Sequence, residues 1–176
     1  MRFTPAPLAG VYLIQLEPHT DARGMFARAF CAREFAKRGL QTSFVQANVS
    51  TNERAGTLRG LHFQRSPHAE VKLVRCTRGA VYDVVVDMRT DSPTYLRWFG
   101  AELTSENGAM MYVPQGVAHG YQALSDGASV FYMVSTYYTP AAEGGLRHDD
   151  PALAIGWPRP VSAISDKDAR WPLLRR

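Results

Sequence analysis

The sequence has few cysteines and no long hydrophobic run, and both absences exclude classes of protein. Its 176 residues include only two cysteines, Cys31 and Cys76, which form neither a zinc-type motif nor a disulfide framework. The longest apolar stretch near the start, residues 8–16, is interrupted by Tyr12 and Gln15 and is too short to span a membrane. No signal-peptide cleavage pattern follows it. We therefore expect a cytoplasmic protein that is neither exported nor bound to a membrane.

The sequence also lacks a local concentration of charges of one sign. The 20 basic and 16 acidic residues give a net charge of +4, but they are interspersed and form no basic stripe. This pattern argues against a nucleic-acid partner and favours a small phosphorylated ligand. Hydrophobic residues make up 45% of the chain, and no linker, repeat or low-complexity tract divides it. We therefore expect a single domain over residues 1–176.

Helical periodicity is scarce as well, whereas short β-branched and aromatic runs recur between residues 71 and 138. Turn residues separate these runs at spacings typical of an antiparallel sandwich or barrel. In the run VYDVVVDMR, alternation places Val84 on one face, and Asp83 and Asp87 on the other. We expect one face to meet the core and the other to carry polar groups. Further strands are expected at residues 71–75, 95–103, 110–113, 119–124 and 130–137.

One helix is expected, at residues 31–38, where AREFAKR contains good helix formers and Gly39 follows as a stop. A second helical turn is expected near residues 166–170. From Thr139 onward the chain contains five prolines, which oppose regular strands. The sequence therefore predicts an all-β fold, a jelly-roll barrel with a short helix near 31–38 and an irregular C-terminal wrap.

Polar and ionisable residues fall on strand positions that should face the interior of such a barrel. In LRGLHFQ, His62 and Gln64 share one face with Gly60, while Arg59 lies on the other. Lys72 follows ten residues after His62. A dry core does not tolerate such groups unpaired, so we expect a barrel interior that holds a small ligand.

The stretch NGAMMYVPQGVAHGY, with the spacing G-x5-P-x-G-x2-H ending at His119, resembles the second motif of the cupin superfamily. In metal-binding cupins, a His-x-His pair and a glutamate complete the site. Here the pair reads His62-Phe63-Gln64, and an amide oxygen is a poor ligand for transition metals. Glu70 could still complete a set of three, but we expect no metal. A metal-dependent cupin oxygenase or isomerase is the alternative.

Ten segments together resemble a narrower family, the dTDP-4-dehydrorhamnose 3,5-epimerases, which are a metal-free branch of the cupins. The segments occur in the family's order, at about its spacing, and extend from Asp21 to Asp168. They are DARGMF, QANVS, GTLRGLHFQ, KLVRC, DVVVDMR, SPTY, YVPQGVAHGY, YYTPAAEGG, DPALAIGWP and SDKD. The resemblance implies an isomerase that inverts C3 and C5 of a nucleotide-linked 4-keto-6-deoxyhexose without a cofactor.

The resemblance also implies four catalytic residues. His62 matches the base that removes a carbon-bound proton, and Asp168 matches its carboxylate partner. Tyr132 matches the acid that reprotonates the opposite face, and Lys72 matches the cation near the enolate oxygen. Imidazole titrates near neutrality, a phenol can donate a proton, and a fixed cation stabilises an enolate, so each residue type suits its role.

Further positions match residues that contact sugar, diphosphate or base in the family. They are Arg23, Gln46, Asn48, Arg59, Lys72, His119, Tyr138, Glu143 and Lys167. Arg28 is also expected at the nucleotide, but it departs from the family's glutamate and exchanges an acceptor for a donor. A CDP- or GDP-sugar substrate, or epimerisation at one centre only, is therefore an alternative.

The resemblance implies a homodimer whose N-terminal strands cross to the neighbouring barrel and bring the Arg23 region to its site. A non-catalytic sugar-binding cupin remains an alternative of a different class. It would bind the same nucleotide-diphosphate sugar without exchanging its protons.

Overall fold

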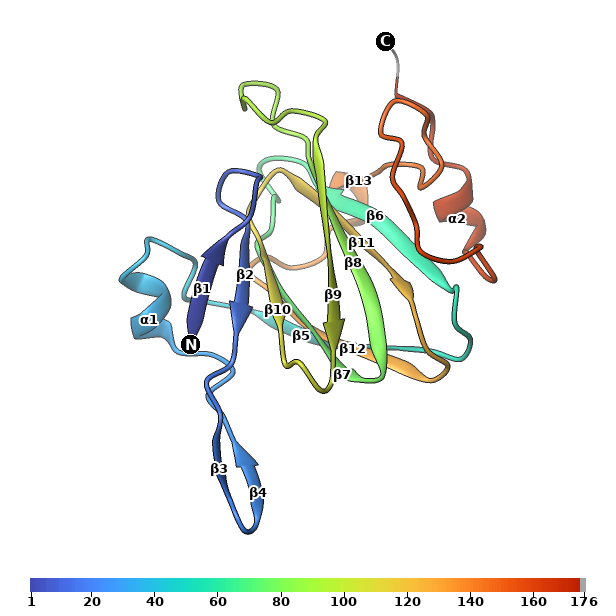
Figure 1. Cartoon of the computed structure of the whole chain (residues 1–176). Coiled ribbons are helices and arrows are strands. Elements are labelled where there is room, and N and C mark those ends of the chain that lie inside the picture. Colours follow the sequence, from blue (N-terminus) through green and yellow to red (C-terminus); the bar gives the residue numbers. More distant parts are fainter. Residues whose placement is uncertain (175–176) are drawn as a thin grey trace.

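Antiparallel β-strands form most of the regular structure in residues 1–174, which the computed structural model describes (Figure 1). Six strands form one sheet, ordered β1 (Arg2–Pro5), β2 (Tyr12–Gln15), β10 (Met110–Val113), β7 (Lys72–Arg78), β12 (Ala128–Val134) and β5 (Gln46–Asn52). Five form the second, ordered β13 (Glu143–Gly145), β6 (Leu58–Gln64), β11 (Val117–Ala123), β8 (Ala80–Asp87) and β9 (Trp98–Thr104). The predicted all-β jelly roll is confirmed, although the two sheets do not close into a continuous barrel.

The main hydrophobic core lies between the two sheets. It joins side chains such as Val74 and Val130 of the first sheet to Val85 and Tyr121 of the second. Along β8, alternate residues face opposite ways, as their spacing predicts. The predicted polar face does carry Asp83 and Asp87, but Val85 on that face lies in the core, and Val84 on the other face packs under the C-terminal segment. Both faces of β8 are therefore buried.

The two short helices cover different parts of the sandwich. Helix α1 (Ala32–Ala36) is shorter than the predicted 31–38, and its Phe35 packs against aromatic side chains on the outer face of the first sheet. Helix α2 (Asp166–Ala169) lies beside β6 within the predicted C-terminal wrap (Figure 1). That wrap is irregular apart from the 3-10 turn η1 (Pro140–Ala142), β13 and α2. No helix in residues 1–174 has the length and apolarity that crossing a membrane requires.

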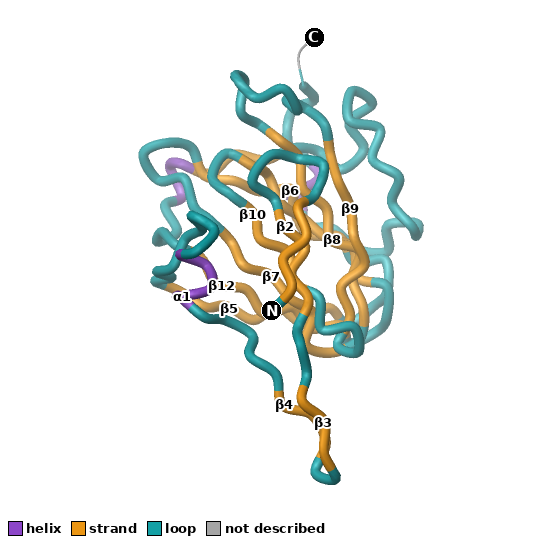
Figure 2. Tube along the Cα trace, turned by 60° about the vertical axis from the view of Figure 1, so that its left-hand side comes forward, coloured by secondary structure: helices purple, strands orange, loops and turns teal. Residues whose placement is uncertain are grey.

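A small hairpin projects from the body of the protein (Figure 2). It consists of β3 (His19–Asp21) and β4 (Gly24–Phe26), which pair only with each other. Its Met25 and Phe26 side chains are 61% and 72% exposed. The hairpin therefore contributes nothing to the core of its own chain.

Asp87 at the end of β8 forms a buried hydrogen-bond network. Its carboxylate accepts hydrogen bonds from Arg89 Nε at 2.8 Å and from the hydroxyls of Ser92 and Thr94, both at 2.6 Å. Burial alone would raise the pKa of Asp87, but these hydrogen bonds outweigh it and hold the pKa well below its ordinary 3.8. The network's stabilisation is therefore complete above about pH 4 and is lost as the pH falls further.

We expect Asp87→Asn to lower the free energy of unfolding at pH 7 by about 2 kcal/mol, because the charged acceptor is lost from a buried network. Urea unfolding at pH 7 and at pH 3 measures this effect. Since the wild-type carboxylate loses its advantage in acid, the gap between the two proteins should narrow at pH 3. An equal difference in the free energy of unfolding at both pH values would contradict a contribution from the ionised Asp87 carboxylate.

Candidate active site

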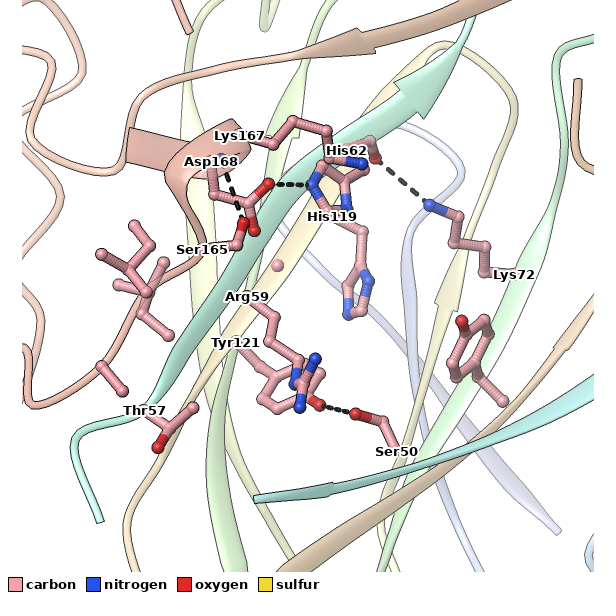
Figure 3. A pocket seen from close by; sticks show the side chains of 15 residues that line it. Ser50, Thr57, Arg59, His62, Lys72, His119, Tyr121, Ser165, Lys167 and Asp168 are labelled. Carbon is pink, nitrogen blue, oxygen red and sulfur yellow. Dashed lines mark hydrogen bonds and ion pairs between the residues drawn. The ribbon is translucent and has the colours of Figure 1, made fainter. Parts of the chain in front are cut away.

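Two adjoining cavities lie between the sheets and beside α2. Their volumes are about 590 and 430 Å³, and both are lined by His62, Lys72, Tyr132 and Lys167. Three of the four residues that the sequence assigns to catalysis therefore border both cavities, and Asp168 lines the larger one. The space between the sheets is the candidate active site (Figure 3).

His62 and Asp168 form a hydrogen-bonded pair although 106 residues separate them in sequence. His62 Nε2 lies 2.6 Å from Asp168 Oδ1 (Figure 3), and the Gly60 N–H donates to Oδ2 at 3.0 Å. Ser165 caps α2 by accepting from the Asp168 N–H, which fixes the carboxylate's position. A carboxylate at Nε2 favours the tautomer that carries its proton there, leaving the Nδ1 lone pair free.

The charge of Asp168 is set by its surroundings. Burial would raise the pKa of Asp168, but hydrogen bonds from His62 and from the Gly60 N–H outweigh it and hold the pKa below its ordinary value. The carboxylate is thus ionised at neutral pH. An ionised partner stabilises the imidazolium that forms when His62 accepts a proton.

An extra residue in β6 decides which side chains face the cavity. His62 pairs with His119 while Arg59 pairs with Tyr121, so three steps along β6 match two along β11. This bulge places Arg59 and His62 on the same cavity, whereas regular alternation predicts opposite faces. Gly60 allows it, because its φ is +106° and a Cβ there would lie 2.6 Å from Gly120 Cα.

Tyr132 faces the cavity from the other sheet. It lies on β12, whereas His62 lies on β6, so the two side chains approach a ligand between the sheets from different sides. Burial raises the pKa of Tyr132 above its ordinary value, with a further contribution from Tyr121. The phenol is therefore protonated at neutral pH and able to act as an acid.

Lys72, the first residue of β7, supplies positive charge at the same place. Its Nζ donates to the main-chain oxygen of His62 at 3.2 Å (Figure 3) and lies 3.0 Å from Glu70 Oε1. Its side chain is only 11% exposed. A cation that is largely shielded from water stabilises developing negative charge more strongly than an exposed one.

His119 forms a second histidine–carboxylate pair. Its Nε2 lies 2.8 Å from Oδ2 of Asp83 on the adjacent strand β8, and both side chains are buried. Alternation predicts Asp83 on a polar face but assigns it no role at the site. The pairing depends on which strands are neighbours, and the alternation within one strand does not show that.

Ser50 and Tyr121, which received no role from the sequence, line the larger cavity beside Arg59. Arg59 Nε donates to Asn52 Oδ1 at 2.8 Å, and the Tyr121 hydroxyl donates to Ser50 Oγ at 2.9 Å. These contacts hold the Arg59 guanidinium at the wall, where it can bind an anion through its remaining N–H groups. Ser50 and Tyr121 end the segments QANVS and YVPQGVAHGY but received no role from the resemblance, and Asn52 lies outside all ten segments.

The remaining predicted binding residues gather at the smaller cavity. Gln46, Asn48, Tyr138, Glu143 and Lys167 line it. Lys167 Nζ lies 2.8 Å from Glu143 Oε1, and the Tyr138 hydroxyl donates to Glu143 Oε2 at 3.1 Å. Gln46 Oε1 accepts from the Tyr138 N–H at 3.1 Å. These contacts link β5, β13 and α2 across the cavity.

Arg23 and Arg28 lie away from both cavities. Arg23 follows β3 in the projecting hairpin, where it pairs with Asp21 and its side chain is 89% exposed. Arg28 lies 3.5 Å from Glu34 of α1. A single chain does not bring these two arginines to the site, and their role in binding stays a prediction.

The residues that could serve as cupin-type metal ligands are each paired with something else. His62 contacts Asp168, His119 contacts Asp83, and Glu70 contacts Lys72. Within residues 1–174, no three histidine, cysteine, aspartate or glutamate side chains are grouped as metal ligands. Gln64 is also engaged, because its Oε1 accepts from the Thr139 N–H at 2.6 Å.

We expect Asp168→Asn to lower kcat about 10²-fold, because a neutral amide no longer supports a protonated His62. Incorporation of solvent deuterium into the 4-keto sugar that the resemblance implies, followed by NMR, measures the rate. Asp166→Asn is the matched control, since Asp166 lies on the same helix with an 87% exposed side chain that pairs with Arg170. Equal rates in the two variants would contradict a role for the His62–Asp168 pair.

Comparisons with known proteins identify the family of the chain. A family model described as dTDP-4-dehydrorhamnose 3,5-epimerase matches residues 5–176. An enzyme of that name from Sinorhizobium fredii is 44% identical over 99% of this chain and 90% of its own. A dTDP-4-dehydrorhamnose 3-epimerase from Streptomyces niveus is 41% identical over 96% of this chain and 81% of its own.

A solved structure supports the same assignment. The 3,5-epimerase from Bacillus anthracis, crystallised with TDP and pyrophosphate, has a TM-score of 0.93 and 39% identity, covering 98% of this chain and 99% of its own. The match also supports the jelly-roll fold expected from the cupin-like motif. The chain therefore belongs to the dTDP-4-dehydrorhamnose 3,5-epimerase family and is a sugar epimerase, an isomerase.

Proposed function

We propose that this chain epimerises a dTDP-linked 4-keto-6-deoxyhexose at C3 and C5 through an enolate. His62 Nδ1 removes the proton from the carbon next to the C4 ketone. The electron pair of that C–H bond forms a double bond from this carbon to C4, and negative charge develops on the ketone oxygen. Tyr132 then donates its hydroxyl proton to the opposite face of the same carbon, which inverts it.

The observation that carries this proposal is the placement of His62 and Tyr132. His62 is hydrogen-bonded to a buried carboxylate at 2.6 Å, and it shares a cavity with a protonated phenol from the opposite sheet. Inversion requires a base on one face of a carbon and an acid on the other. Lys72 supports the enolate oxygen, since its ammonium lies beside His62 in the same cavity.

The diphosphate and nucleoside have candidate partners of their own. The Arg59 guanidinium and the Lys167 ammonium suit phosphate oxygens, and His119 lines the same cavity. TDP bound to the Bacillus anthracis relative supports a thymidine nucleotide. Arg28 remains the reason to test CDP- and GDP-sugars, and the 3-epimerase from Streptomyces niveus is the reason to test each carbon separately.

A homodimer is part of the proposal. The hairpin formed by β3 and β4 exposes Met25 and Phe26, which burial against a second copy would shield from water. Arg23 lies in the turn of this hairpin, away from the cavities of its own chain. Crossing to the neighbouring protomer would bring that arginine to the partner's nucleotide.

The proposal is tested by incubating the protein with 4-keto-6-deoxyhexoses linked to dTDP, CDP or GDP in deuterated water and recording NMR spectra. Deuterium at both C3 and C5 with inversion is the expected result for the dTDP sugar. Deuterium at one carbon identifies a single-centre epimerase. Binding without exchange would identify a non-catalytic sugar-binding protein, and exchange abolished by a chelator would identify metal-dependent chemistry.

A further inference from the structure

Glu70 is a buried carboxylate that takes no part in the proton transfers described above. Glu70 lies two residues before Lys72, with which it forms an ion pair, and its side chain is only 7% exposed. It lines the smaller cavity together with His62 and Tyr132. Carboxylates are almost never buried to this extent unless they are paired.

The partner of Glu70 is Lys72. Glu70 Oε1 lies 3.0 Å from Lys72 Nζ, and both residues line the smaller cavity. Lys72 Nζ also donates to the main-chain oxygen of His62 at 3.2 Å. An ammonium group has three N–H donors, so these two contacts leave one for a ligand in the cavity.

The backbone around Glu70 is held on both sides. Before it, the Ala69 oxygen accepts from Gln115 Nε2 at 3.0 Å and from Thr136 Oγ1 at 3.2 Å. After it, the Val71 N–H donates to Ser135 Oγ at 2.8 Å. The position of the carboxylate is therefore set by contacts with the segment after β12 and with the turn before β11.

The second oxygen of Glu70 indicates that packing alone does not explain this residue. Oε2 is buried and has no hydrogen-bond partner within residues 1–174. An unpaired buried carboxylate oxygen is costly, and an apolar side chain would fill the space at lower cost. Glu70 also adds, after burial and Tyr121, to the raised pKa of Tyr132, which keeps that phenol protonated.

We propose that Glu70 is a positioning residue whose carboxylate holds the Lys72 ammonium where the sugar ketone oxygen gains negative charge. The inference rests on the enolate mechanism proposed above. Glu70 acts through Lys72 and does not itself touch the reacting atoms. Its contribution is to restrict a flexible four-carbon side chain to one orientation before the substrate enters.

A double-mutant cycle tests this inference. We expect Glu70→Gln to lower kcat for deuterium exchange about tenfold with KM changed less than about threefold, because the fixed cation acts on the transition state. In a Lys72→Met background, the same change should alter kcat less than about twofold, since no ammonium remains to be positioned. Glu70→Asp retains the charge at a shorter reach and should recover part of the loss.

Glu102→Gln is the matched control, because it removes one exposed carboxylate from β9, away from the cavities. An equal loss of kcat in both backgrounds, or a Glu70→Gln rate within about twofold of wild type, would overturn the inference. If Glu70→Gln unfolds, the same cycle with Glu70→Asp decides. Absence of exchange in the wild-type protein would instead refute the proposed function.

Discussion

Replacing His62 by asparagine is expected to abolish nearly all exchange of solvent deuterium into the sugar, with a fall in kcat of about 10³-fold or more. Asparagine has no titratable nitrogen, so nothing at this position can accept a carbon-bound proton. Nucleotide binding should persist, because Arg59 and Lys167 lie elsewhere on the cavity wall. NMR in deuterated water measures the exchange, and calorimetry with TDP measures the binding.

His68→Asn is the matched control for this experiment. His68 contacts Thr139 Oγ1 and is not among the residues lining either cavity. Its replacement should leave kcat within about twofold of wild type, as expected of a change away from the reacting atoms. Exchange in His62→Asn within tenfold of wild type would remove His62 as the base.

The second large effect is expected for Tyr132→Phe, in which deuterium exchange and inversion should separate. His62 can still remove a proton and return a deuteron to the same face, so the substrate becomes labelled without changing configuration. Formation of the epimer should fall about 10³-fold, because the opposite face has lost its acid. NMR distinguishes the labelled substrate from the labelled epimer within a single sample.

A control variant and the pKa of the phenol both bear on the Tyr132 experiment. Tyr95→Phe removes a hydroxyl from a partly exposed tyrosine in the loop before β9 and should leave both rates unchanged. In the wild type, burial raises the pKa of Tyr132 above 10, so its acid form should persist across the neutral range. Exchange and inversion lost by the same factor in Tyr132→Phe would contradict a role for this phenol on one face only.

The strands could be predicted from sequence because their signals are local. Alternation along β8 and turn residues around it depend only on neighbouring positions, and they placed Val85 and Val84 on opposite faces correctly. That the C-terminal segment, and not the other sheet, covers Val84 could not be predicted in this way. It depends on the C-terminal segment, whose irregular path carries no periodic signal.

The site shows the same division between local and long-range information. His62 and Asp168 were identified together by resemblance to a family, since nothing in their own surroundings marks residues 106 positions apart as partners. Alternation predicts Asp83 on a polar face of its strand, but its contact with His119 depends on the pairing of β8 with β11. Asn52 lies outside every quoted segment and Tyr121 ends one of them, but neither could be assigned a role, because hydrogen-bonding side chains are common in strands without any role in a site.

The bulge in β6 makes this site more sensitive to the length of one strand than to the identity of most of its residues. Removing a single residue between positions 59 and 62 would restore regular alternation. Every side chain of β6 on one side of the deletion would then turn to the opposite face of the sheet. Either Arg59 or His62 would then lie beneath the C-terminal segment, where Leu61 and Leu146 pack. The anion-binding and proton-abstracting ends of the cavity thus depend on a surplus residue that carries out no chemistry.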